Sequence, residues 1–222
     1  MAREKLVDQQ PAMVGGLNDV SDDSALQPDQ LRRATNLRLT DYGAATKRGG
    51  TQRTSTNALA AAAVLNGFTF QQDGGTNQIL AVCNGVLRTT TYGTFPWTFA
   101  TQSGALSTTV APDFAQFRDT GGNDVVYIAD GGLLNKWSGS ALTVDIANTV
   151  AVDTLQVHNE RLWACGNSSF PDSIFYSALN DGDTLGYGAG GGGQIIVRTF
   201  GDEKIVGLAS INTSLLIFHR RG

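Results

Sequence analysis

The chain has 222 residues, a length that suits one domain, or one domain with an arm, and that allows about 70% of the unfolded chain's surface to be buried. Hydrophobic residues make up 41% and charged residues 16%, which excludes a disordered or fibrous protein. The 27 glycines and the many threonines favour a turn-rich β protein. A net charge of −4 argues against a broadly basic nucleic-acid-binding protein.

The first 56 residues differ in composition from the rest of the chain. Half of the 16 Lys and Arg residues lie within residues 1–53, and apolar periodicity is weak there. The apolar content is too small for a separate core, so we predict an extended arm over residues 1–56 that docks on another protein. Within it, residues 28–34 could form one short helix, and the alternation around Leu37 and Leu39 predicts a short strand.

Strand patterns recur from residue 57 onward in units of roughly 40–50 residues. Each unit contains short apolar strands separated by Asn-Gly, Asp-Gly or similar turns, which are strong hairpin signals. The predicted strands cover residues 67–70, 78–83 and 86–90; 114–117, 124–129 and 133–137; 154–157, 161–165 and 173–177; and 205–209 and 215–219. The alanine-rich residues 59–65 are ambiguous between helix and strand.

This repeat predicts an all-β fold, a β-propeller over residues 57–222. A β-sandwich would also give short strands and turns, but it does not predict a repeat of this order, so the propeller is favoured over the sandwich. The fourth unit lacks its last strands, and three and a half blades cannot close a ring. We therefore expect the propeller to be incomplete in this chain, with further blades downstream of Gly222 or, as the alternative, completion by other chains.

Two features bear on location. No run approaches the 18 apolar residues of a membrane helix, and the N-terminal sequence lacks the apolar core of a signal peptide. The only cysteines, Cys83 and Cys165, lie in strand-like apolar runs and are predicted to be buried free thiols. We expect a protein that stays in the cytoplasm or is built into a particle assembled there, without a membrane partner.

The sequence predicts no catalytic residue, no cofactor-binding residue and no metal ligand. Gly186, Gly188 and Gly191 match the dinucleotide pattern G-x-G-x-x-G, but a strand pattern follows where that motif needs a helix. Asp181 and Asp183 could supply oxygen to a cation, although a solvated turn is the favoured interpretation. With two histidines and no G-x-S-x-G motif, a hydrolase is disfavoured.

Several short motifs resemble one family of proteins. They are Gly15-Gly16-Leu17-Asn18, Leu26-Gln27-Pro28-Asp29-Gln30-Leu31, Ala34-Thr35-Asn36-Leu37, Lys47-Arg48-Gly49-Gly50-Thr51, Asn159-Glu160-Arg161-Leu162-Trp163, Ile174-Phe175-Tyr176-Ser177-Ala178-Leu179 and Gly201-Asp202-Glu203-Lys204-Ile205-Val206-Gly207-Leu208. Together they resemble the neck, tail-nozzle or packaged-DNA-stabilisation proteins of tailed bacteriophages. Gly49 stands where that family often has proline.

The resemblance implies a non-enzymatic virion protein, part of a ring of identical copies around the DNA exit channel, which helps retain and pass the genome. Its partners would be copies of itself, neighbouring neck or tail proteins and, non-specifically, the passing DNA. The basic residues predicted to serve these interfaces, or to touch DNA phosphates, are Arg32, Arg33, Lys47, Arg48, Arg220 and Arg221. The alternative function is a carbohydrate-binding or receptor-binding tail propeller.

Overall fold

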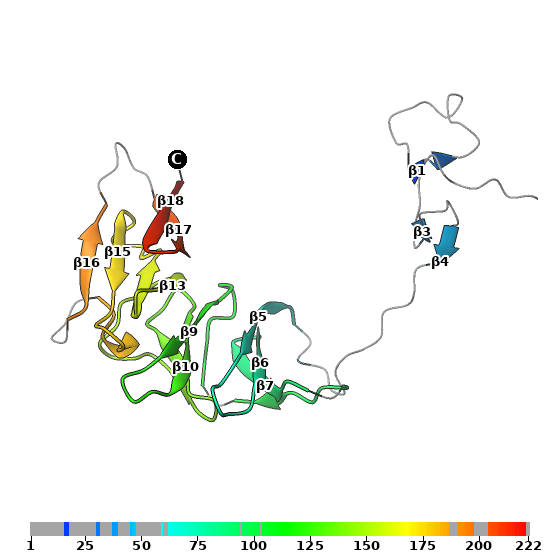
Figure 1. The fold of residues 1–222 in the computed structure, drawn as a ribbon, viewed down its shortest axis with the longest axis horizontal. Helices are drawn as coiled ribbons and strands as arrows, with labels where there is room; N and C mark the ends of the chain where they lie inside the picture. Colours follow the sequence, from blue (N-terminus) through cyan, green and yellow to red (C-terminus); the bar gives the residue numbers. More distant parts are fainter. Residues whose placement is uncertain are drawn as a thin grey trace, which may run out of the picture. The chain divides into compact units, whose positions relative to one another are not determined.

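The computed structural model describes residues 59, 62–93, 95–102, 104–186, 191–197 and 204–220, together with the backbone of four short strands within residues 16–47. The chain divides into two units, Met1–Gln52 and Arg53–Gly222. The described residues form an all-β protein, with one 3-10 turn at Gly182–Thr184 and no α-helix among them (Figure 1).

The described strands of the first unit form two small sheets. Strand β1 (Gly16–Leu17) pairs in parallel with β2 (Gln30–Leu31), and β3 (Leu37–Leu39) pairs antiparallel with β4 (Ala45–Lys47). The predicted strand around Leu37 and Leu39 is confirmed. The helix predicted over residues 28–34 is wrong at Gln30–Leu31, because these two residues take up strand pairing with β1.

The described residues of the second unit form four antiparallel sheets whose strands follow one another in sequence order. We name them the first, second, third and fourth sheets. Their strands are β5 (Val64–Phe70), β6 (Gln78–Cys83), β7 (Val86–Thr91) and β8 (Ala100–Thr101); β9 (Asp113–Arg118), β10 (Asp124–Ala129), β11 (Asn135–Trp137) and β12 (Leu142–Thr143); β13 (Thr154–His158), β14 (Arg161–Cys165), β15 (Ser173–Tyr176) and β16 (Gly193–Ile196); and β17 (Lys204–Ile211) and β18 (Ser214–Arg220).

Turn residues determine where one of the hairpins forms. Asn84 and Gly85 both have positive φ, 53° and 69°, and they join Cys83 to its register partner Val86. Two consecutive positive-φ residues define the turn that matches the right-handed twist of paired strands, and Asn-Gly favours it. The predicted Asn-Gly hairpin is therefore confirmed. Of residues 59–65, which were ambiguous between helix and strand, Val64 and Leu65 belong to strand β5.

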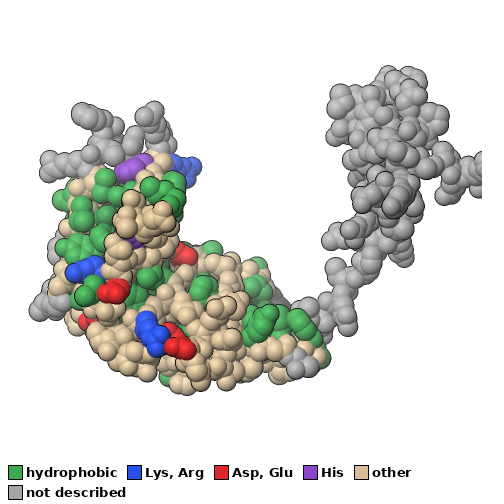
Figure 2. Space-filling model, viewed as in Figure 1, with side chains coloured by type: hydrophobic (Ala, Val, Ile, Leu, Met, Phe, Trp, Pro, Cys, Tyr) green, Lys and Arg blue, Asp and Glu red, His purple; other side chains and the backbone are tan. Residues whose placement is uncertain are grey.

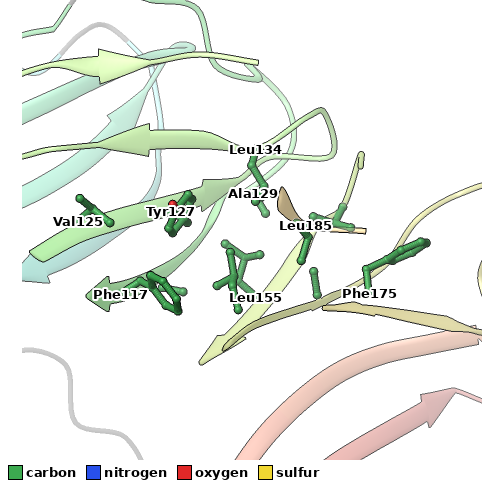
Figure 3. Packing of buried hydrophobic residues seen from close by; sticks show 12 residues of the cluster. Phe117, Val125, Tyr127, Ala129, Leu134, Leu155, Phe175 and Leu185 are labelled. Carbon is green, nitrogen blue, oxygen red and sulfur yellow. The ribbon is translucent and has the colours of Figure 1, made fainter. Parts of the chain in front are cut away.

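The second sheet is buried on both faces, which explains the continuous apolar sequence of β10. Val126 and Ile128 pack against the first sheet. Val125, Tyr127 and Ala129 point the other way and pack against the third sheet (Figure 3). Since successive strand residues alternate between faces, a strand covered on both sides is apolar at successive positions, as Val125–Ala129 is.

The sheets pack in series. A smaller cluster built around Ile174 and Cys165 joins the third sheet to Ile205 and Leu208 of the fourth sheet. The first strand of each sheet also lies beside the first strand of the next, in the order β5, β9, β13 and β17. No two of these four sheets share a hydrogen-bonded strand pair, so over the described residues they form a row of separate sheets.

Candidate interaction surfaces

The predicted basic interface residues fall in different places. Arg220 ends β18 and is exposed. Lys47 ends β4, of which the structure describes the backbone. Arg32, Arg33, Arg48 and Arg221 lie outside the described residues. The structure adds a cation that sequence reasoning missed, because Lys204 lies directly opposite Arg220 in the register of β17 and β18.

The fourth sheet exposes one apolar face. Phe218 is 50% exposed and Leu216 39% exposed, and Val206 and Ile211 are exposed on the neighbouring strand. Leu215 and Ile217, which alternate with them on β18, pack instead towards the third sheet. Figure 2 shows hydrophobic side chains at the surface where Figure 1 draws β17 and β18. One face of this sheet is thus built like an interior surface but is open among the described residues.

Side chains bridge the first strands of adjacent sheets. Gln116 on β9 accepts a hydrogen bond from the backbone N–H of Gln71 at 3.1 Å and donates to its carbonyl oxygen at 2.6 Å. Asp113, also on β9, accepts from the N–H of Leu155 on β13 at 2.8 Å. Burial raises the pKa of Asp113, the N–H groups of Leu155 and Phe114 lower it in part, and the Asp153 carboxylate raises it further. These bonds hold neighbouring sheets in register.

The third such bridge joins a histidine to a serine. Nδ1 of His158 on β13 lies 2.7 Å from Oγ of Ser210 on β17, and Nε2 lies 3.0 Å from the side-chain nitrogen of Asn159. In the Ser-His-Asp triad of hydrolases, a carboxylate at the second ring nitrogen orients and stabilises the imidazolium. Here the second ring nitrogen meets an amide. The His158–Ser210 pair therefore joins the third sheet to the fourth, with an amide at the second ring nitrogen.

Asp181 and Asp183 are occupied by protein groups. Asp183 accepts a hydrogen bond of 2.7 Å from the hydroxyl of Tyr127 and forms an ion pair with Lys136. Asp181 accepts from the N–H of Asp183 and caps the 3-10 turn. Within the part of the chain that the structure describes, no three His, Cys, Asp or Glu side chains come together as metal ligands.

A polar cleft of about 460 Å³ lies between turns of the first and second sheets. Its acidic side chains already have partners. Asp124 accepts a hydrogen bond from the N–H of Asp73, Asp73 pairs with Arg118 at 3.2 Å, and Asp119 accepts from the N–H of Asn123 at 2.8 Å. That last hydrogen bond lowers the pKa of Asp119. The cleft is polar enough for a hydroxylated ligand, but its carboxylates chiefly order the two turns.

Two of the aromatic residues between β7 and β8 are exposed. Tyr92 and Phe95 are each 59% exposed, whereas Phe99 is buried. The rings of Phe95 and Trp97 are in contact, with centroids 4.4 Å apart. Exposed aromatic side chains with one buried anchor form a small surface suited to contact with another molecule.

The remaining sequence candidates take up structural roles. Strand β16 follows the glycine-rich segment that begins at Gly186, and not the helix a dinucleotide site requires; residues 187–190 lie outside the described residues. Cys83 and Cys165 are both buried and free, as predicted. Burial raises the pKa of the Cys165 thiol to about 12.

Comparison of the sequence with protein-family models and with curated protein sequences gave no match. Over the described residues, no helix has the length and apolar character needed to span a membrane.

Proposed function

We propose that this chain is a structural component of a tailed-phage virion, a neck or tail-nozzle ring around the DNA exit channel. The observation that carries the proposal is the serial packing of three four-stranded meander sheets and a two-stranded sheet, each with its first strand beside the next. Sheets repeated in series are the arrangement expected of β-propeller blades, and this supports a propeller in which each repeat of the sequence forms one blade.

The resemblance of the N-terminal motifs to phage neck and nozzle proteins supplies the biological context. Two of those motifs supply the strands β1 (Gly16–Leu17) and β2 (Gln30–Leu31), which pair with each other. A ring wall requires no chemical step. This fits a chain in which His158, one of the two described histidines, and the carboxylates Asp113 and Asp183 make contacts between sheets.

The proposed ring is tested by its size and its position. Native mass spectrometry of the purified chain should show a closed cyclic oligomer, alone or after addition of the neighbouring neck proteins. Electron microscopy with an antibody against the chain should label the head–tail junction or tail of the particle. A monomer that never enters the particle would contradict the proposal.

A carbohydrate-binding or receptor-binding tail protein is the second candidate. It is favoured by the exposed Tyr92 and Phe95 rings and by the polar cleft beside Asp73 and Asp124. Binding of the monomer to host-surface glycans, lost on replacing Tyr92 and Phe95 by alanine, would support this candidate over the ring.

A further inference from the structure

The chain contains two Asn-Gly pairs, Asn66-Gly67 and Asn84-Gly85. Asparagine is a chemically labile residue, because the main-chain nitrogen that follows it can attack its side-chain amide. A following glycine favours this attack, since it has no Cβ to obstruct the approach. Both asparagines are exposed, so exposure alone does not distinguish them. Their hydrogen bonds do.

The reacting groups of Asn66 are held by the protein. Nδ2 of Asn66 donates to the carbonyl oxygen of Pro112 at 2.8 Å, and Oδ1 accepts from the N–H of Gly67, also at 2.8 Å. Gly67 is in addition the register partner of Ala81 in the ladder of β5 and β6. The amide that would leave and the nitrogen that would attack are both engaged. Asn66 therefore reacts only when this part of β5 opens.

The tip of the β6–β7 hairpin is held more weakly. Among the described residues, neither the side chain of Asn84 nor the N–H of Gly85 has a hydrogen-bond partner. Gly85 is buried against Leu106 and Thr108, so the tip must lift from these residues before its nitrogen meets solvent. One hydrogen bond, from the N–H of Leu106 to the carbonyl oxygen of Gly85 at 2.8 Å, opposes this movement. Opening here costs fewer bonds than opening at Asn66.

We propose that Asn84 is a site of deamidation in the folded protein, through a cyclic imide formed with Gly85. After the Gly85 nitrogen has given its proton to hydroxide, it forms a bond to Cγ of Asn84, and the side-chain nitrogen leaves as ammonia. Water then opens the imide at either of its carbonyl groups, which gives aspartate or isoaspartate. This modification site is separate from the proposed ring function and does not depend on it.

The two products should affect the hairpin differently. Asp-Gly favours the same turn as Asn-Gly, so aspartate at position 84 keeps the hairpin. Isoaspartate adds a CH₂ group to the main chain inside a two-residue turn, and the length of this turn sets the pairing of Cys83 with Val86. The longer turn cannot keep both that pairing and the bond from Leu106 to Gly85.

The test is incubation of the full chain in mildly alkaline buffer, followed by peptide mapping with mass spectrometry. We expect Asn66 to convert at least about tenfold more slowly than Asn84, the factor that one further hydrogen bond of typical net strength gives. In concentrated urea the two sites should convert at similar rates, because the dipeptide is the same. Conversion at Asn66 as fast as at Asn84 in the folded chain would overturn the proposal. So would an Asn84 that stays intact while the unfolded chain converts.

Asn212 is the control for turn geometry. It lies between β17 and β18 with a positive φ of 51°, as Asn84 lies between β6 and β7, but Thr213 follows it. The β-branched side chain hinders attack by the Thr213 nitrogen, so Asn212 should be the slowest of the three sites. Equal rates at Asn212 and Asn84 would show that attack by the Gly85 nitrogen is not the route.

Two variants separate the reaction from its effect on stability. Asn84→Gln should abolish conversion at position 84 and leave the rate at Asn66 unchanged. Asn84→Asp carries only the aspartate product and should unfold in urea at the same concentration as the unchanged protein. Aged protein that an isoaspartyl methyltransferase labels at position 84 should unfold at a lower concentration. Unfolding of the labelled protein at the original concentration would contradict the expected loss of turn geometry.

Discussion

The hydroxyl of Tyr127 donates a 2.7 Å hydrogen bond to Oδ1 of Asp183, and so ties the second sheet to the 3-10 turn that follows β15. The Tyr127 side chain is 1% exposed, so its hydroxyl has little access to water as an alternative partner. Burial is the main cause that raises the pKa of this hydroxyl, and the Asp183 carboxylate adds to it. This contact joins two residues that lie 56 positions apart in the sequence.

Removing the acceptor should destabilise the protein. Asp183→Ala leaves the Tyr127 hydroxyl without its bond and Lys136 without its ion pair. We expect the free energy of unfolding in urea to fall by about 1–3 kcal/mol. Asp73→Ala is the control, since its ion pair with Arg118 is solvent-exposed and should contribute less than about 1 kcal/mol. Equal losses in the two variants would contradict this account.

The same ring explains why residue 182 is glycine. A Cβ at Gly182 would overlap the Tyr127 ring, with the hydroxyl oxygen only 2.8 Å away. Gly182→Ala should therefore force a shift in the packing of the second and third sheets and cost about 1–3 kcal/mol of unfolding free energy. A Cβ at Gly93 meets no atom within 4 Å, so Gly93→Ala should be nearly neutral in the same thermal or urea unfolding experiment.

Asp113 should make a pH-dependent contribution to stability. Burial raises its pKa in the folded state above the value of the unfolded chain. The folded state therefore holds this proton more tightly, and stability is lost as the pH rises through the folded-state pKa. Asp113→Asn cannot ionise. The unfolding free energy of the unchanged protein, minus that of the variant, should thus decrease as the pH rises through and above the ordinary aspartate pKa. An increase over this range would show that the N–H groups of Leu155 and Phe114 dominate over burial.

The two cysteines should be unreactive in the folded protein. Cys83 and Cys165 are both buried, and a pKa of about 12 keeps the Cys165 thiol protonated at neutral pH. A thiol-specific reagent at neutral pH should label neither residue without denaturant and both residues in concentrated urea. Labelling of Cys165 in the native protein at the rate of the unfolded chain would mean that the cluster around Ile174 opens.

Much of the strand content follows from the sequence alone. Alternation, continuous apolar runs and paired turn residues placed β6, β7, β10, β14 and β18 close to their observed positions, because these signals depend on neighbours a few residues apart. The two-residue strands β8 and β12 escaped notice, since two residues cannot show a period. The helix expected over residues 28–34 was wrong because Gln30–Leu31 pair with Gly16–Leu17. Helix signals depend on neighbouring residues, so they carry no information about a contact between residues distant in the sequence.

The order of turns and apolar strands in the sequence determined that the chain is all-β and repeats by sheet. Only the tertiary structure decided which side chains meet between sheets. The pairs Tyr127 with Asp183, Asp113 with Leu155, and Lys204 with Arg220 each depend on strand register or on the packing of one sheet against the next. Register is a long-range property, because a shift of one residue moves every side chain of a strand to the opposite face. For this reason the sequence identified the basic residue Arg220, but only the structure placed Lys204 beside it.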